Sequence, residues 1–371
     1  MPRRAMVGTS LEPLLAMALP LLQEAQRQCP RTGPGAKPIY KDYEIAAIIF
    51  CAEVKKKKRK SACYRFAVEN RKLFMDQLQL KRLPARSTFC DRYSRVWPLV
   101  RAAITLQGRR AVQEHVCNAQ VVAVDKSVVP TLGPVWHIRD RNAGVVPEGL
   151  HGLDTEAAWG HSDYHDWVYG YSFEVVVTAP PANSGAAAFP LIASVDLASA
   201  SEQRTILDKV EHLPPSTEIM DADSAYDGER VANAVERPGG MDGKSRRRRR
   251  GKRGSPRIRR RFLCPPRDGK VGQYQQKGQR EQQRQRRLKR YEFLCSRRGQ
   301  TLYARRKQTV EPFNATLKRM FELEDHTWHR GLNNNRTQIL MAIFCYQLLV
   351  RYHWKQNKGR NAQVQYLLDG L

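Results

Sequence analysis

Three short acidic segments, far apart in a strongly basic chain, constrain the fold more than any other feature of the sequence. Asp125 ends the segment VVAVD, Asp223 follows the segment TEIMDA, and Glu311 lies in TVEPFNATLKRM. The runs VVAV and TEIM are typical of strands, whereas Thr309 is a candidate cap for a helix whose first turn tolerates Pro312. Carboxylates from two strand ends and one helix can converge in such a fold.

A cluster of this kind predicts a site for divalent cations. Carboxylate oxygens are the ligands that Mg²⁺ prefers in proteins. Two such ions about 3.5–4 Å apart can activate a water or a DNA hydroxyl and stabilise the leaving oxygen of a phosphodiester. We therefore expect Asp125, Asp223 and Glu311 to be catalytic and to hold two Mg²⁺ or Mn²⁺ ions. Asp221 stays an alternative to Asp223, because residues two apart in an extended strand point to the same face.

The charge balance points to a polyanionic partner. The chain has 371 residues with 64 Lys and Arg against 36 Asp and Glu, a formal net charge of +28. Residues 241–310 alone hold 26 basic and 4 acidic residues, a net charge of +22. Phosphates are the natural ligands of such a segment, so the arginine run Arg246, Arg247, Arg248, Arg249 and Arg250 is a candidate DNA contact. An RNA partner for the same segment remains an alternative.

The chain divides into three parts by composition. Residues 1–115 read as helical and form a candidate DNA-binding region, with Arg86 and Arg92 as candidate contacts. Residues 116–356 alternate strand and helix patterns, with a basic insertion at about 238–308, and residues 357–371 form a tail. The eight cysteines include no CxxC pair, which argues against a disulfide framework or a structural zinc. We expect no membrane span and a cytoplasmic protein.

The strongest family signal surrounds Glu311. Many DDE transposases of bacterial insertion sequences carry a tyrosine, an arginine, a glutamate and a lysine separated by two, three and six residues. Glu311 and Lys318 keep the six-residue gap, while the two earlier positions hold Ala304 and Lys307. A tyrosine and an arginine, Tyr303 and Arg306, each stand one position before them. The chain resembles this family in the order and context of its acidic segments.

The resemblance implies a fold and a reaction. The expected fold is α/β, with a ribonuclease H-like mixed five-stranded sheet flanked by helices, after an N-terminal helical region and with the insertion before the last catalytic helix. WVYGYSFEVVVTA and AAFPLIASVDLAS correspond to the hairpin that follows the first catalytic strand in the family. The family's second aspartate is typically followed at three residues by a tyrosine, here Tyr226, which favours Asp223 over Asp221.

The implied activity is metal-dependent cleavage and strand transfer at insertion-sequence ends. The resemblance assigns DNA-phosphate contacts to Lys318, Lys307 and Arg306, and DNA with a homodimer assembled on it as partners, close to the bacterial nucleoid. A catalytically inactive, transposase-derived DNA-binding protein remains an alternative, as does an RNA-binding protein.

Overall fold

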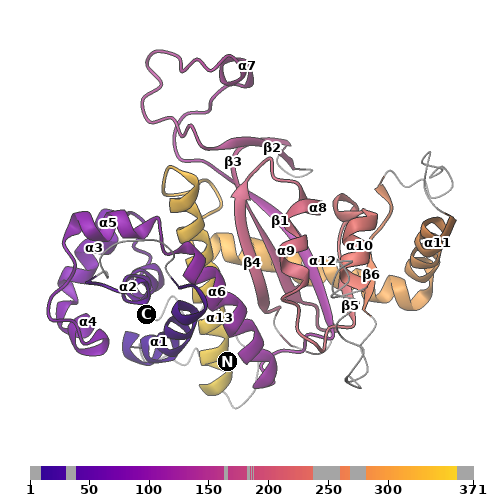
Figure 1. The fold of residues 1–371 in the computed structure, drawn as a ribbon, viewed down its shortest axis with the longest axis horizontal. Coiled ribbons are helices and arrows are strands. Elements are labelled where there is room, and N and C mark those ends of the chain that lie inside the picture. Colours follow the sequence, from indigo (N-terminus) through magenta and orange to yellow (C-terminus); the bar gives the residue numbers. More distant parts are fainter. Residues whose placement is uncertain are drawn as a thin grey trace, which may run out of the picture.

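The structure is a computed structural model that describes residues 10–30, 39–162, 166–181, 184, 186, 188–236, 260–267 and 281–356. It opens with six helices, which lie to the left and centre of Figure 1. They are α1 (Leu11–Gln28), α2 (Asp42–Val54), α3 (Lys60–Glu69), α4 (Arg71–Leu78), α5 (Arg86–Tyr93) and α6 (Trp97–Gln113). Helices thus make up most of the described part of residues 1–115, the range that the sequence predicts to be helical.

A mixed sheet follows these helices. Its strands are β1 (Val121–Pro130), β2 (Ala158–Ser162), β3 (Asp166–Thr178), β4 (Pro190–Leu197), β5 (Ile219–Asp221) and β6 (Arg261–Leu263). The order is β2-β3-β1-β5-β6, and β4 also pairs with β3. β3 is antiparallel to β1, β2 and β4, whereas β5 is parallel to both β1 and β6. The mixed sheet is confirmed, and the short β2 is a strand beyond the five expected.

The predicted hairpin after the first strand is β3 paired with β4. β1 is longer than the sequence predicts, because Val128 and Val129 continue the pairing with β3 as far as Pro130. Asp125 therefore lies in the middle of β1 and not at its end. A small arm that includes α7 (Ile138–Asn142) projects from the sheet between β1 and β2 (Figure 1).

Helices cover both faces of the sheet. The face of β1 opposite Asp125 meets α8 (Glu202–Thr205), where Lys126 pairs with Glu202 at 3.0 Å. α9 (Leu207–Val210), the 3-10 turn η2 (Ser224–Tyr226) and α10 (Glu229–Glu236) continue the chain. Ile206 between the two short helices α8 and α9, Val210 in α9 and Leu213 after it are buried.

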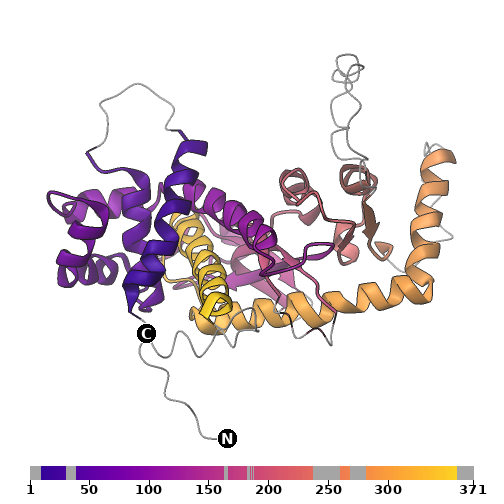
Figure 2. The ribbon, with the colours of Figure 1, turned by 90° about the horizontal axis from the view of Figure 1, so that it is seen from below.

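Three helices complete the described part of the fold. α11 (Glu281–Cys295) and α12 (Arg297–Met320) follow one another, and α12 runs along the sheet in Figure 2. α13 (Leu332–Gln356) packs against α6, α2 and β4, and its residues Thr337–Arg351 are buried on all sides. Gly108 lets α6 approach β4, because a Cβ there would lie 2.6 Å from the Leu191 carbonyl oxygen.

The start of the helix that carries Glu311 differs from the prediction. α12 begins at Arg297, capped by the Ser296 hydroxyl, which accepts a hydrogen bond from the Gly299 N–H at 3.1 Å. Thr309 is not a cap, since its hydroxyl donates back to the Arg305 carbonyl within the helix. Glu311 and Pro312 are thus interior residues of α12. No helix in the described ranges has the length and apolar run needed to cross a bilayer.

Candidate active site

Asp125 lies on β1, and its side chain contacts α12. Side chains alternate along a strand, so Asp125 points to α12 while Lys126 points to α8 on the other face. Arg306 Nη1 lies 3.3 Å from Asp125 Oδ1, and Asn314 Nδ2 donates to Asp125 Oδ2 at 3.0 Å. Both carboxylate oxygens of Asp125 are therefore engaged by donors from α12.

Burial raises the pKa of Asp125 to about 7. The positive charge of Arg306 opposes this rise, whereas the negative charges of Asp223 and Glu311 add to it. Because like charges raise a carboxyl pKa only when they are near, this coupling brings the three predicted catalytic carboxylates into one electrostatic cluster. We call Asp125, Asp223 and Glu311 the carboxylate cluster.

Asp223 lies two residues after the end of β5. Its side chain accepts a hydrogen bond from the Ala225 N–H at 3.0 Å and so caps the η2 turn. Asp221, at the end of β5, is fully buried, and neither carboxylate oxygen has a hydrogen-bond partner among the described residues. Burial raises the pKa of Asp221 well above its usual value. The more accessible Asp223 is thus better placed than Asp221 to meet a ligand from solvent.

Glu311 is the most open member of the cluster, with 53% of its side chain exposed. Its Oε1 lies 3.9 Å from Arg306 Nη2. Asn314 and Lys318 follow Glu311 at three and seven residues and so share its side of α12. The Lys318 ammonium donates to the Val128 carbonyl at 2.6 Å, and burial lowers the pKa of Lys318.

The three carboxylates of the cluster interact electrostatically, but they do not form a compact group. Within the described ranges, no group of three or more His, Cys, Asp or Glu side chains is close enough to hold a metal ion. The donor set nonetheless consists of carboxylate oxygens, which fit the chemistry of Mg²⁺ or Mn²⁺.

The predicted DNA contacts fall into three groups. Arg306 and Lys318 have the internal partners given above, and Arg92 is buried in an ion pair with Asp42 on α2. Lys307 and Arg86 are exposed. The run Arg246–Arg250 lies outside the described residues. Of the basic residues expected near Glu311, the one aimed at Asp125 is Arg306, while Lys307 points to solvent.

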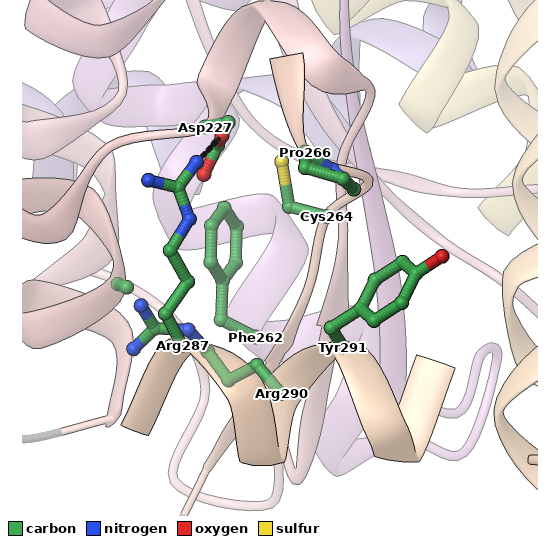
Figure 3. A pocket seen from close by; sticks show the side chains of 8 residues that line it. Asp227, Phe262, Cys264, Pro266, Arg287, Arg290 and Tyr291 are labelled. Carbon is green, nitrogen blue, oxygen red and sulfur yellow. Dashed lines mark hydrogen bonds and ion pairs between the residues drawn. The ribbon is translucent and has the colours of Figure 1, made fainter. Parts of the chain in front are cut away.

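Sequence reasoning missed the contacts that dock α11 beside the cluster. Arg287 pairs with Asp227, four residues after Asp223, and Figure 3 shows this pair with Phe262 and Cys264 from the β6 segment. One turn on, Arg290 pairs with Glu229 at 2.9 Å and with Glu236 at 3.4 Å. The three-residue spacing of the two arginines, opposite the acids of α10, is the signal that could have revealed this interface.

The tight turn between α11 and α12 makes the position of α12 depend on the position of α11. A Cβ on Gly299 would lie 1.9 Å from the Phe293 carbonyl oxygen, so only glycine fits where the two helices meet. The arginine pairs on α11 therefore help to fix α12, the helix that carries Glu311, relative to the strand that precedes Asp223.

Comparison with known proteins identifies the family. No curated protein and no solved structure matches the chain. The family model described as the transposase DDE domain matches residues 117–348, more than half of the chain and all three members of the carboxylate cluster. The chain belongs to the transposase DDE domain family.

Proposed function

We propose that this protein is a transposase that cleaves DNA strands at the ends of an insertion sequence and joins the freed ends to target DNA. The observation that carries the proposal is the approach of one guanidinium, that of Arg306, to two of the three acids, at 3.3 Å from Asp125 and 3.9 Å from Glu311. Asp223 acts electrostatically on both Asp125 and Arg306, although the successive acids are 98 and 88 residues apart in the chain. A structural role alone would not require two further carboxylates beside a buried aspartate, since each adds repulsion.

We infer a ribonuclease H-like fold for the matched segment. The order and directions of the strands support it: β4, β3 and β1 are antiparallel neighbours, and β5 and β6 then run parallel to β1. In this arrangement a central strand carries Asp125, the adjacent parallel strand leads to Asp223, and a long helix across that face carries Glu311.

Members of the family generally use divalent metals, and the donor set here suits them. Asp125, Asp223 and Glu311 would hold Mg²⁺ or Mn²⁺, which would supply an activated attacking oxygen and stabilise the departing 3′ oxygen. The chain's own contribution is positioning: Asn314 orients Asp125, and the docked α11 fixes the helix that carries Glu311.

Two exposed basic regions are proposed to bind the DNA backbone. The N-terminal helices and their connections present cations that include Lys57, Arg59, Arg65, Arg71, Lys72, Lys81, Arg82 and Arg86. Lys307 on α12 lies within one helical turn of Glu311 and is exposed. Contacts of this kind position a duplex without reading its sequence. We propose that the active form is a homodimer assembled on DNA in the bacterial cytoplasm, beside the nucleoid.

The proposal is tested with duplex DNA that carries the ends of the element encoding this protein. In Mg²⁺, the full chain should nick at the element end, leave a 3′ hydroxyl and transfer it to a target plasmid. A chelator should abolish both products, as should Asp125→Asn, whereas the exposed control Asp325→Asn should retain them. Binding of the ends without cleavage in Mg²⁺ or Mn²⁺ would indicate an inactive DNA-binding protein. Tighter binding to RNA than to these ends would indicate an RNA-binding protein.

A further inference from the structure

Arg306 lies among all three carboxylates. Its two terminal nitrogens approach different acids, with Nη1 3.3 Å from Asp125 Oδ1 and Nη2 3.9 Å from Glu311 Oε1. The negative charge of Asp223 also acts on the guanidinium. A single cation therefore serves the residues that the proposed function assigns to divalent ions.

This arginine is not arranged as a surface contact. It is only 8% exposed, and its Nε is buried without a hydrogen-bond partner among the described residues. Its guanidinium carbon lies 5.9 Å from the centre of the Tyr303 ring. A buried N–H without a partner is costly, so the position of Arg306 must be held by its attraction to the carboxylates.

The position of Arg306 also accounts for the loose arrangement of the cluster. With Asn314 on one oxygen of Asp125 and Arg306 on the other, both carboxylate oxygens of Asp125 face protein donors, and no group of three acids close enough to hold a metal ion forms in the described part of the chain. Hard divalent ions need those same oxygens. An ion and a guanidinium within about 4 Å of each other would repel strongly in a partly buried site.

We propose that Arg306 is the resident counter-cation of the carboxylate cluster, occupying the space between Asp125 and Glu311, so that a divalent ion can bind there only by displacing it. The inference rests on the proposed function, because it takes the cluster to be the metal site. The free protein is then held in a low-affinity state, and metal loading requires the guanidinium to leave. The displaced arginine could meet a DNA phosphate, to which its fork of donors is suited.

The test measures Mn²⁺ binding to the full chain without DNA, by the loss of the free-ion electron paramagnetic resonance signal. Arg306→Gln should bind Mn²⁺ at least about tenfold more tightly than the wild type. Lys307→Gln removes the same charge from the exposed neighbouring position and controls for long-range electrostatics, so it should change the affinity much less. The Mn²⁺-induced rise in melting temperature should be larger for Arg306→Gln than for the wild type.

Asp125→Asn, alone and combined with Arg306→Gln, separates the inference about Arg306 from the proposed metal site. One outcome is that Mn²⁺ binding depends on Asp125 but Arg306→Gln binds Mn²⁺ no more tightly than the wild type. Arg306 would then have only a structural role, and this inference would fail while the proposed metal site stands. If Asp125→Asn leaves Mn²⁺ binding unchanged in both backgrounds, the proposed metal site fails as well. Arg306→Met is the second variant, should Arg306→Gln not fold. It removes the charge but keeps an unbranched side chain, so it should bind Mn²⁺ more tightly than the wild type, and equal or weaker binding would overturn the inference.

Discussion

Lys58 forms a buried ion pair with Glu53. The ammonium donates to Glu53 Oε1 at 2.7 Å, and each side chain is 2% exposed. The same ammonium lies 5.1 Å from the centre of the Phe321 ring, at the end of α12. A residue of the basic run KKKKRK thus ties the N-terminal helices to the helix of Glu311.

Removal of Lys58 should destabilise the protein strongly. Lys58→Ala would leave Glu53 as an uncompensated buried acid, and we expect the free energy of unfolding to fall by about 3–5 kcal/mol. Urea denaturation of the wild type and the variant measures this change. Lys57→Ala, which truncates the exposed neighbour in the same run, should stay within about 0.5 kcal/mol of the wild type. Equal effects of the two substitutions would show that the buried pair has no special role.

Stability should depend on pH through His329. Burial, with a smaller contribution from the Lys60 charge, lowers the pKa of His329 to about 3, and its Nε2 lies 3.0 Å from the Tyr93 hydroxyl. In the unfolded chain the imidazole titrates near about 6.5, so only the unfolded state takes up this proton between about pH 6.5 and about pH 3. The contribution of His329 to the free energy of unfolding is therefore complete above about pH 6.5. This contribution is lost as the pH falls, by at most about 1.4 kcal/mol per pH unit.

His329→Gln should remove this part of the pH dependence. The free energy of unfolding, measured by urea denaturation from about pH 7 to about pH 4, should fall less steeply for the variant than for the wild type. His151→Gln, which replaces an exposed histidine, should follow the wild type. Parallel curves for His329→Gln and the wild type would exclude His329 as the titrating group.

The arginine run of the basic insertion should contribute a sequence-independent part of DNA affinity. Each phosphate neutralised releases counterions, so log affinity should fall with log salt by about 0.9 per duplex phosphate contact. Replacing Arg246–Arg250 with glutamine should weaken binding to element ends and to unrelated DNA alike and make the salt dependence shallower. A loss of affinity for the element ends alone would instead indicate base readout. An unchanged dependence of log affinity on log salt would show that these arginines face solvent and do not neutralise phosphates.

Some features of the fold could be read from local pattern. The β-branched run before Asp125 predicts a strand, because that signal depends only on neighbouring residues. The extent of β1 could not be read in this way. Its continuation past Asp125 depends on pairing with β3, some 45 residues further along the chain.

The sequence also could not show which basic residues form contacts inside the protein. Arg306 and Lys307 are adjacent and equally cationic, yet one is buried against Asp125 and the other is exposed. Which of them faces the sheet depends on the phase of α12, and that phase is fixed by the cap at Ser296 and by the docking of α11. The sequence shows neither contact directly.

The most direct test of the account is strand cleavage by Glu311→Gln in Mg²⁺, measured on element-end DNA beside a binding assay on the same DNA. The amide keeps the shape of the side chain but removes a negative oxygen ligand. Glu292→Gln, at an exposed position on α11, is the matched control. We predict that both variants bind the DNA like the wild type, while only Glu311→Gln loses cleavage, by at least about a hundredfold. Cleavage by Glu311→Gln at the wild-type rate would contradict the assignment of the carboxylate cluster as the catalytic site.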